Sequence, residues 1–92
     1  MRDKTFVINS IKMDLFRVVT AAGDITKNLP IQSVQEFLHH AEADFKKIDL
    51  SDHEKRLYDE LSLLDTDLHK YLQDEKSRLR WAEKILTIRC RL

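Results

Sequence analysis

Four histidines and the carboxylates near them are the residues of this 92-residue chain best suited to metal chemistry. His40 lies four residues after Glu36 and four residues before Asp44, so on a helix the three side chains share one face. His39 points about 100° away from His40 and cannot chelate a metal together with it. Glu36 and His39 have the Glu-x-x-His spacing of di-iron bundles, but no second copy of that motif follows. We therefore interpret the histidines as solvated surface residues and expect no metal and no cofactor.

A phosphoryl-accepting histidine is a weaker alternative. The segment from Ser51 to Leu57 loosely resembles the histidine box of sensor kinases, with His53 as the acceptor. It lacks the proline that follows in that box and lies at a predicted helix start. A histidine-dependent site, metal or phosphoryl, therefore ranks below the other functions considered for this chain.

Nucleophilic catalysis has no support in the sequence. The single cysteine, Cys90, stands two residues from the end, with no glycine-rich elbow and no base at a fixed spacing. One glycine in the whole chain leaves no phosphate-cradling loop. Asp65 and Asp67 are two apart and diverge on a helix. We expect that the protein is not an enzyme.

The cellular location follows from the cysteine content and the apolar runs. A lone thiol fits a reducing compartment, and no apolar run is long enough for a signal peptide or a membrane span. We therefore expect a cytoplasmic protein without membrane contact.

Composition favours an all-α fold in one domain over residues 1–92. The chain has one Gly, one Pro and 35% charged residues. Apolar residues recur at alternating steps of three and four over approximately 5–27, 31–48 and 52–90, which predicts three helices. Short connections between them predict an up-down-up antiparallel bundle. The predicted core residues are Ile8, Ile11, Leu15, Val18, Ala22, Ile25, Val34, Leu38, Ala41, Phe45, Ile48, Leu57, Leu61, Leu64 and Leu68.

The third predicted helix is the longest of the three, because residues 52–90 contain neither Gly nor Pro to interrupt it. Ser51 and Glu54 have the spacing of a capping box at its start. At 1.5 Å per residue it would be about 58 Å long, whereas the helix over 5–27 would be about 34 Å and would cover it only to about residue 75. The apolar side chains beyond that point would be exposed, and such stretches usually mark an interface. The predicted interface residues are Leu72, Leu79, Trp81, Ala82, Ile85, Leu86 and Ile88.

Charge is unevenly distributed although the total is zero. Residues 42–75 carry five Lys/Arg against eleven Asp/Glu, and residues 76–92 carry six against one. Antiparallel pairing of two copies would set acidic and basic halves together, so we predict a non-catalytic interaction or regulatory module that acts as a helical homodimer, with a further protein partner. The alternative is a small nucleic-acid-binding protein. Its contacts would be Lys76, Arg78, Arg80, Lys84, Arg89 and Arg91.

Overall fold

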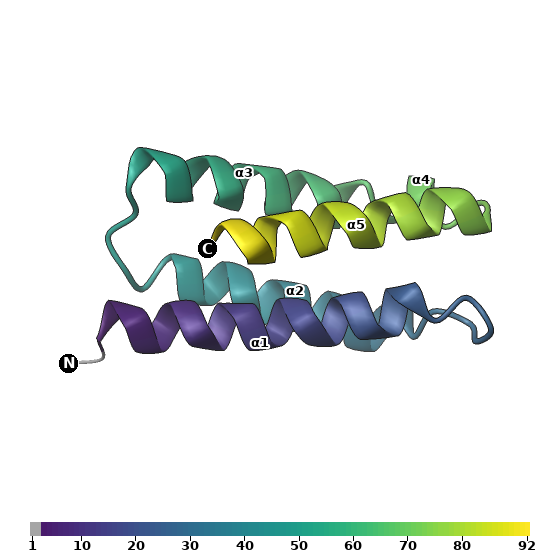
Figure 1. Ribbon diagram of the computed structural model, residues 1–92, viewed down its shortest axis with the longest axis horizontal. Helices are drawn as coiled ribbons and strands as arrows, with labels where there is room; N and C mark the ends of the chain where they lie inside the picture. Colours follow the sequence, from purple (N-terminus) through teal and green to yellow (C-terminus); the bar gives the residue numbers. More distant parts are fainter. Residues whose placement is uncertain (1–2) are drawn as a thin grey trace.

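Five helices account for most of the chain in the computed structural model, which describes residues 3–92. They are α1 (Lys4–Gly23), α2 (Ile31–Phe45), α3 (Asp52–Thr66), the short α4 (Leu68–Tyr71) and α5 (Glu75–Arg91) (Figure 1). The all-helical class is confirmed for the described residues. No helix among them is both long enough and apolar enough to cross a membrane.

Local side-chain hydrogen bonds set both ends of α1. At the start, the carboxylate of Asp3 accepts a hydrogen bond from the amide of Thr5. At the end, the side chain of Asp24 accepts from both the amide and the hydroxyl of Thr26. Such a turn competes with continuation of the helix. The predicted extension to residue 27 is therefore wrong, and Ile25 is 38% exposed instead of lying in the core.

α2 begins after Pro30 and ends at Phe45. A proline fits there because its missing amide hydrogen would have no partner in the first helical turn. The chain turns three residues before the predicted end at 48, so Ile48 is only partly buried at the edge of the core.

The capping box predicted at the start of α3 is confirmed. Ser51 Oγ accepts from the Glu54 amide at 3.2 Å, and Glu54 Oε1 accepts from the Ser51 amide at 2.9 Å.

The predicted continuous helix over 52–90 is wrong. The helical run breaks at Asp67 and again between Tyr71 and Glu75, where the chain reverses direction and α5 returns along α3 (Figure 1). Asp74 makes the restart possible because its carboxylate accepts from the Ser77 amide at 2.7 Å, as an N-cap. Burial of the apolar face of α5 on its own chain then outweighs helix propensity, which is a weak preference per residue.

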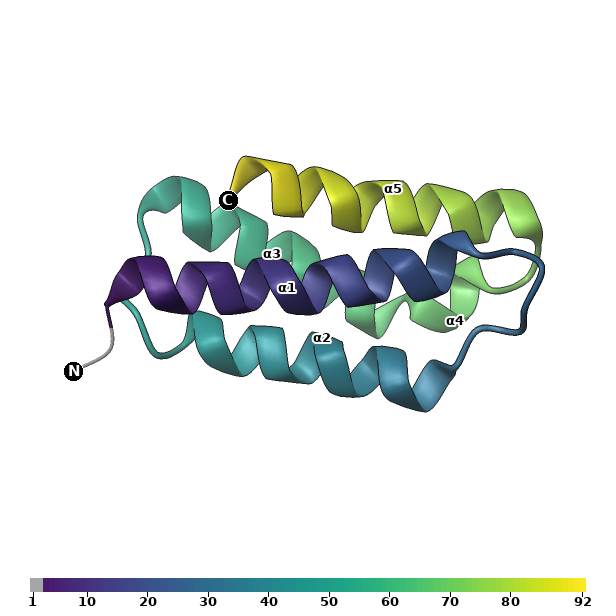
Figure 2. The same ribbon diagram turned by 60° about the horizontal axis from the view of Figure 1, so that its bottom comes forward.

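The four long helices form an antiparallel bundle in place of the predicted three-helix bundle. α1 and α3 run one way, while α2 and α5 run the other way (Figures 1 and 2). α1 packs against α2 and α5, and α3 packs against the same two helices. The order around the bundle is therefore α1, α2, α3, α5. The described chain measures 41 × 20 × 19 Å.

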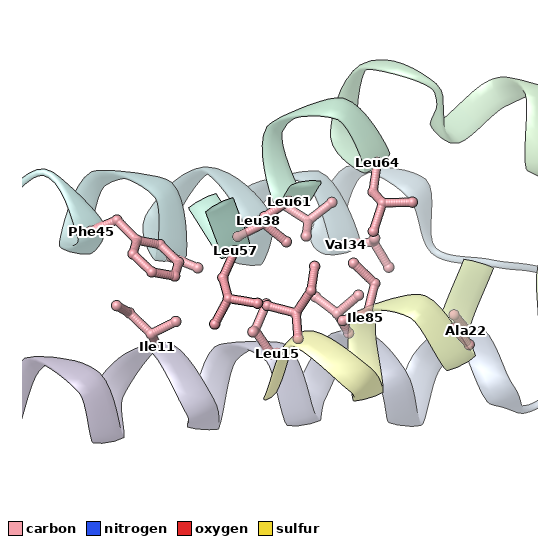
Figure 3. Close-up of a cluster of buried hydrophobic side chains, with 14 of the residues drawn as sticks. Ile11, Leu15, Ala22, Val34, Leu38, Phe45, Leu57, Leu61, Leu64 and Ile85 are labelled. Carbon is pink, nitrogen blue, oxygen red and sulfur yellow. The ribbon is translucent and has the colours of Figure 1, made fainter. Parts of the chain in front are cut away.

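The core runs the length of the bundle between all four helices (Figure 3). Of the predicted core residues, only Ile25 and Ile48 lie outside the buried set. Val7 and four residues of α5 join that set without having been predicted in it. The α5 residues are Trp81, Ala82, Ile85 and Ile88. Trp81 is 1% exposed, and its indole Nε1–H donates to the Leu64 carbonyl oxygen at 2.9 Å, which ties α5 to α3.

Candidate functional site

The residues predicted to join two copies divide into three groups. Trp81, Ala82, Ile85 and Ile88 belong to the core of their own chain and have no surface to offer a partner. Leu72 is half-buried against that core. Only two members are exposed, Leu79 at 37% and Leu86 at 41%. The residues beyond about 75 therefore need no second copy to cover them, because α5 folds back and is covered by α1 and α3.

The basic segment is also partly used inside the chain. The Arg78 guanidinium donates to the carbonyl oxygens of Ala21, Ala22, Asp24 and Lys27 at 2.7 to 3.1 Å, around the end of α1. The carbonyls of Ala21 and Ala22 are in the last turn of α1, where a helix end leaves them without intrahelical partners. This arginine is thus a structural clamp, and its guanidinium donors are used within the chain.

Two further predicted contacts of the basic segment have partners in the chain. Arg89 Nε donates to the Lys12 carbonyl oxygen at 3.1 Å, and the Arg89 guanidinium lies 5.5 Å from the centre of the Phe16 ring. Lys84 Nζ donates to the Tyr71 hydroxyl at 3.0 Å. The remaining three of the predicted six are exposed side chains on α5: Lys76, Arg80 and Arg91.

An apolar cleft of about 310 Å³ opens between α3, α4 and α5. Its lining residues are Glu60, Leu63, Leu64, Asp67, Tyr71, Lys84 and Thr87. Leu63 is 61% exposed, the highest fraction among the exposed large apolar side chains of the described chain. A leucine in that position costs free energy in water, which makes the cleft a candidate contact surface.

Opposite charges line this cleft, with Glu60 and Asp67 on the side of α3 and Lys84 on α5. α3 carries five Asp/Glu against two Lys/Arg, and α5 carries six Lys/Arg against two Asp/Glu. The two helices pack side by side and antiparallel, with His53 Nε2 3.1 Å from the Arg91 carbonyl oxygen. The face formed by α3 and α5, called the α3/α5 face below, therefore has an acidic helix, an apolar cleft and a basic helix.

A second polar constellation lies on the other side of the bundle, between α1 and α2. Asp14 of α1 is 4% exposed and Asp44 of α2 is 3% exposed. His40 Nδ1 lies 2.5 Å from Asp14 Oδ2 and 3.6 Å from Asp44 Oδ2. The pairing of His40 with Asp44 follows from their four-residue spacing. Asp14 was missed because it comes from another helix. The sequence signal that could have identified Asp14 was its position beside the apolar seam. It directly precedes Leu15, as Asp44 directly precedes Phe45.

A third group, His39, Glu42 and Asp65, joins α2 to α3. His39 Nε2 is 3.0 Å from Asp65 Oδ2, and Ser62 Oγ donates to Glu42 Oε1 at 2.8 Å. Burial raises the pKa of Glu42, and the neighbouring Asp65 carboxylate adds to that rise. His39 is 64% exposed on its side chain, so this group is more open than the one around His40.

The chain was compared with protein-family models, with curated proteins and with solved structures, and none of the three comparisons found a match. Function is therefore inferred from the geometry and charge of this chain alone.

Proposed function

We propose that this protein is a non-catalytic protein-interaction module that acts as a homodimer, joined through the α3/α5 face. The observation that carries the proposal is the self-complementarity of that face, in which an apolar cleft lies between an acidic and a basic helix. The proposal keeps the homodimer expected from the sequence and moves the contact from the segment after residue 75 to a surface of the folded bundle.

Twofold symmetry selects one orientation. A twofold axis parallel to the helices, midway between α3 and α5, sets α3 of each copy against α5 of the other copy. Acidic and basic helices then meet twice. A twofold axis across the helices would set α3 on α3 and α5 on α5, which juxtaposes like charges. Charge complementarity of this kind selects orientation and contributes less to affinity.

Size and burial are consistent with this contact. A whole long side of the described chain spans 41 by 20 Å, or about 800 Å², and the α3/α5 face is part of such a side. An interface of standard size buries about 800 Å² per partner. Leu63 stands at the rim of the cleft and would enter the cleft of the second copy. Removing such a side chain from water contributes about 1.5–3 kcal/mol.

Molecular mass by light scattering tests the homodimer. We expect a mass of twice the 10.9 kDa chain for the wild type and a shift toward 10.9 kDa for Leu63→Asp. Met13→Asp is the matched control, because Met13 is 57% exposed on α1 and lies outside the α3/α5 face. A wild-type mass near 10.9 kDa at micromolar concentrations and above would contradict the proposal. Equal loss of mass in both variants would place the contact elsewhere.

Nucleic-acid binding is the second candidate, supported by how the bundle distributes charge. α1 and α5 together carry nine Lys/Arg against three Asp/Glu, and α2 and α3 carry two against eight. One side of the bundle is therefore basic although the chain is neutral. Binding of random duplex DNA that weakens steeply with added salt would support this candidate, and absence of binding at low salt would eliminate it.

A further inference from the structure

The cluster between α1 and α2 combines two buried carboxylates with one accessible imidazole. Asp14, His40 and Asp44 each offer one ligand atom, and the three atoms lie within 4.8 Å of one another. Both aspartates are almost fully buried, whereas the side chain of His40 is 57% exposed. Of the three groups, the imidazole is thus the one open to solvent.

The two oxygens of each carboxylate have different partners. The Oδ2 atoms of Asp14 and Asp44 both face His40 Nδ1. The Oδ1 atoms are paired with cations, with Arg17 Nη1 at 3.4 Å from Asp14 and Lys47 Nζ at 3.0 Å from Asp44. Two separate partners thus hold the carboxylates in place while leaving one oxygen of each directed at the same nitrogen.

Ser10 completes the arrangement from α1. Its Oγ donates a hydrogen bond to Asp44 Oδ2 at 2.9 Å. Outer partners that orient ligand atoms in this way are a regular part of metal sites. The arrangement exceeds a single surface ion pair, since two helices, three candidate ligands and three orienting groups participate in it.

We propose that Asp14 Oδ2, His40 Nδ1 and Asp44 Oδ2 form a binding site for a divalent transition metal of the Zn²⁺ type. One imidazole nitrogen and two carboxylate oxygens are ligands that Zn²⁺ accepts, and three protein ligands leave a further coordination position for water. The positive charge of the ion would meet two carboxylates that are already directed at one point. This site goes beyond the dimer proposed above and does not depend on it.

The site would link two helices that are separated by a loop. Asp14 is on α1, and His40 and Asp44 are on α2, so a bound ion joins both elements as a cross-link. A ligand that binds only the folded state raises its stability according to concentration and affinity. Metal binding should therefore appear as a rise in melting temperature, which is a readout independent of any activity.

Titration of the untagged chain with ZnCl₂ tests the site, followed by calorimetry and by thermal unfolding. For the wild type we expect one Zn²⁺ per chain, a Kd of about 10 µM or tighter, and a higher melting temperature. His40→Ala should weaken binding about 10- to 100-fold or more. His39→Ala is the matched control, because the neighbouring histidine belongs to the group with Glu42 and Asp65 and should leave the affinity unchanged.

A second readout keeps the test valid if His40→Ala unfolds. In the wild type, the ring signals of His40 should shift on Zn²⁺ addition in nuclear magnetic resonance spectra, while those of the exposed His69 on α4 should not. No heat and no shift with ZnCl₂ up to about 100 µM would overturn the proposal. Unchanged affinity in folded His40→Ala, or loss of binding only in His39→Ala, would overturn it as well.

Discussion

Single residues in this protein show how a buried charge is tolerated. Burial acts to raise the pKa of Asp44, but hydrogen bonds from Lys47 and Ser10 outweigh it and hold that pKa below its ordinary value of 3.8. The carboxylate therefore stays charged at neutral pH although its side chain is only 5% exposed. A buried polar group is stable when it has partners of this kind and costly when it does not.

The lowered pKa predicts how stability depends on pH. A carboxyl group with a lower pKa in the folded state stabilises the fold above its unfolded-state pKa, and this contribution disappears as pH falls through the folded value. We expect the free energy of unfolding to decrease as pH falls below about 4, and to depend less on pH in Asp44→Asn. Urea unfolding between pH 7 and pH 2.5, in the presence of a chelator, measures both. An Asp44→Asn curve parallel to the wild type would contradict this, and Asp59→Asn on the exposed side of α3 is the control.

At the scale of elements, the short connections decide the architecture. Residues 72–74 reverse the chain without Gly or Pro, and no described residue has a positive φ. The turn therefore depends on polar capping and on packing of the helices on either side. Asp74 has an extended backbone and directs its carboxylate at the Ser77 amide, and this hydrogen bond lowers the pKa of Asp74.

Replacement of Asp74 should test the importance of that cap. Asp74→Ala removes the acceptor at the start of α5, so we expect a lower melting temperature. Asp74→Ser keeps a capping oxygen and should stay close to the wild type. Thermal unfolding followed by circular dichroism measures the effect. If the alanine variant keeps the wild-type melting temperature, packing alone positions α5 and the cap contributes nothing.

For the whole molecule, the return of α5 has two consequences. It completes the core with four buried side chains from α5, and it separates charge across the bundle instead of along one helix. Acidic α2 and α3 then lie on one side, and basic α1 and α5 lie on the other, in front in Figure 1. The α3/α5 face contains one boundary between these sides and the α1/α2 side contains the other, and the apolar cleft lies on the α3/α5 face.

Arg78 holds the ends of α1 and α5 together, and its replacement should affect the whole bundle. Arg78→Ala removes donors to four carbonyl oxygens, and we expect a loss of about 1.5–3 kcal/mol in the free energy of unfolding. Arg78→Lys should recover only part of it, because an ammonium group cannot reproduce the planar fork of donors. Chemical denaturation of the wild type and the two variants measures the order of their free energies of unfolding. Full recovery by lysine would show that the positive charge alone is sufficient.

The sequence by itself determined the helical class, the start of α3 and most of the core. Apolar residues at steps of three and four define a buried stripe whatever the stripe packs against, so Ile11, Leu15, Leu38 and Leu61 were correctly placed. The capping box of Ser51 and Glu54 is a local interaction and was predicted for the same reason.

Only the tertiary structure decided where the last helix lies and which polar groups meet. Helix propensity over 67–74 permits a continuous helix, and the free energy that interrupts it comes from contacts of Trp81, Ile85 and Ile88 with residues far away in the chain. The approach of Asp14 to His40 depends on how α1 packs against α2. Patterns within one helix carry no information on either event, because both depend on contacts between elements.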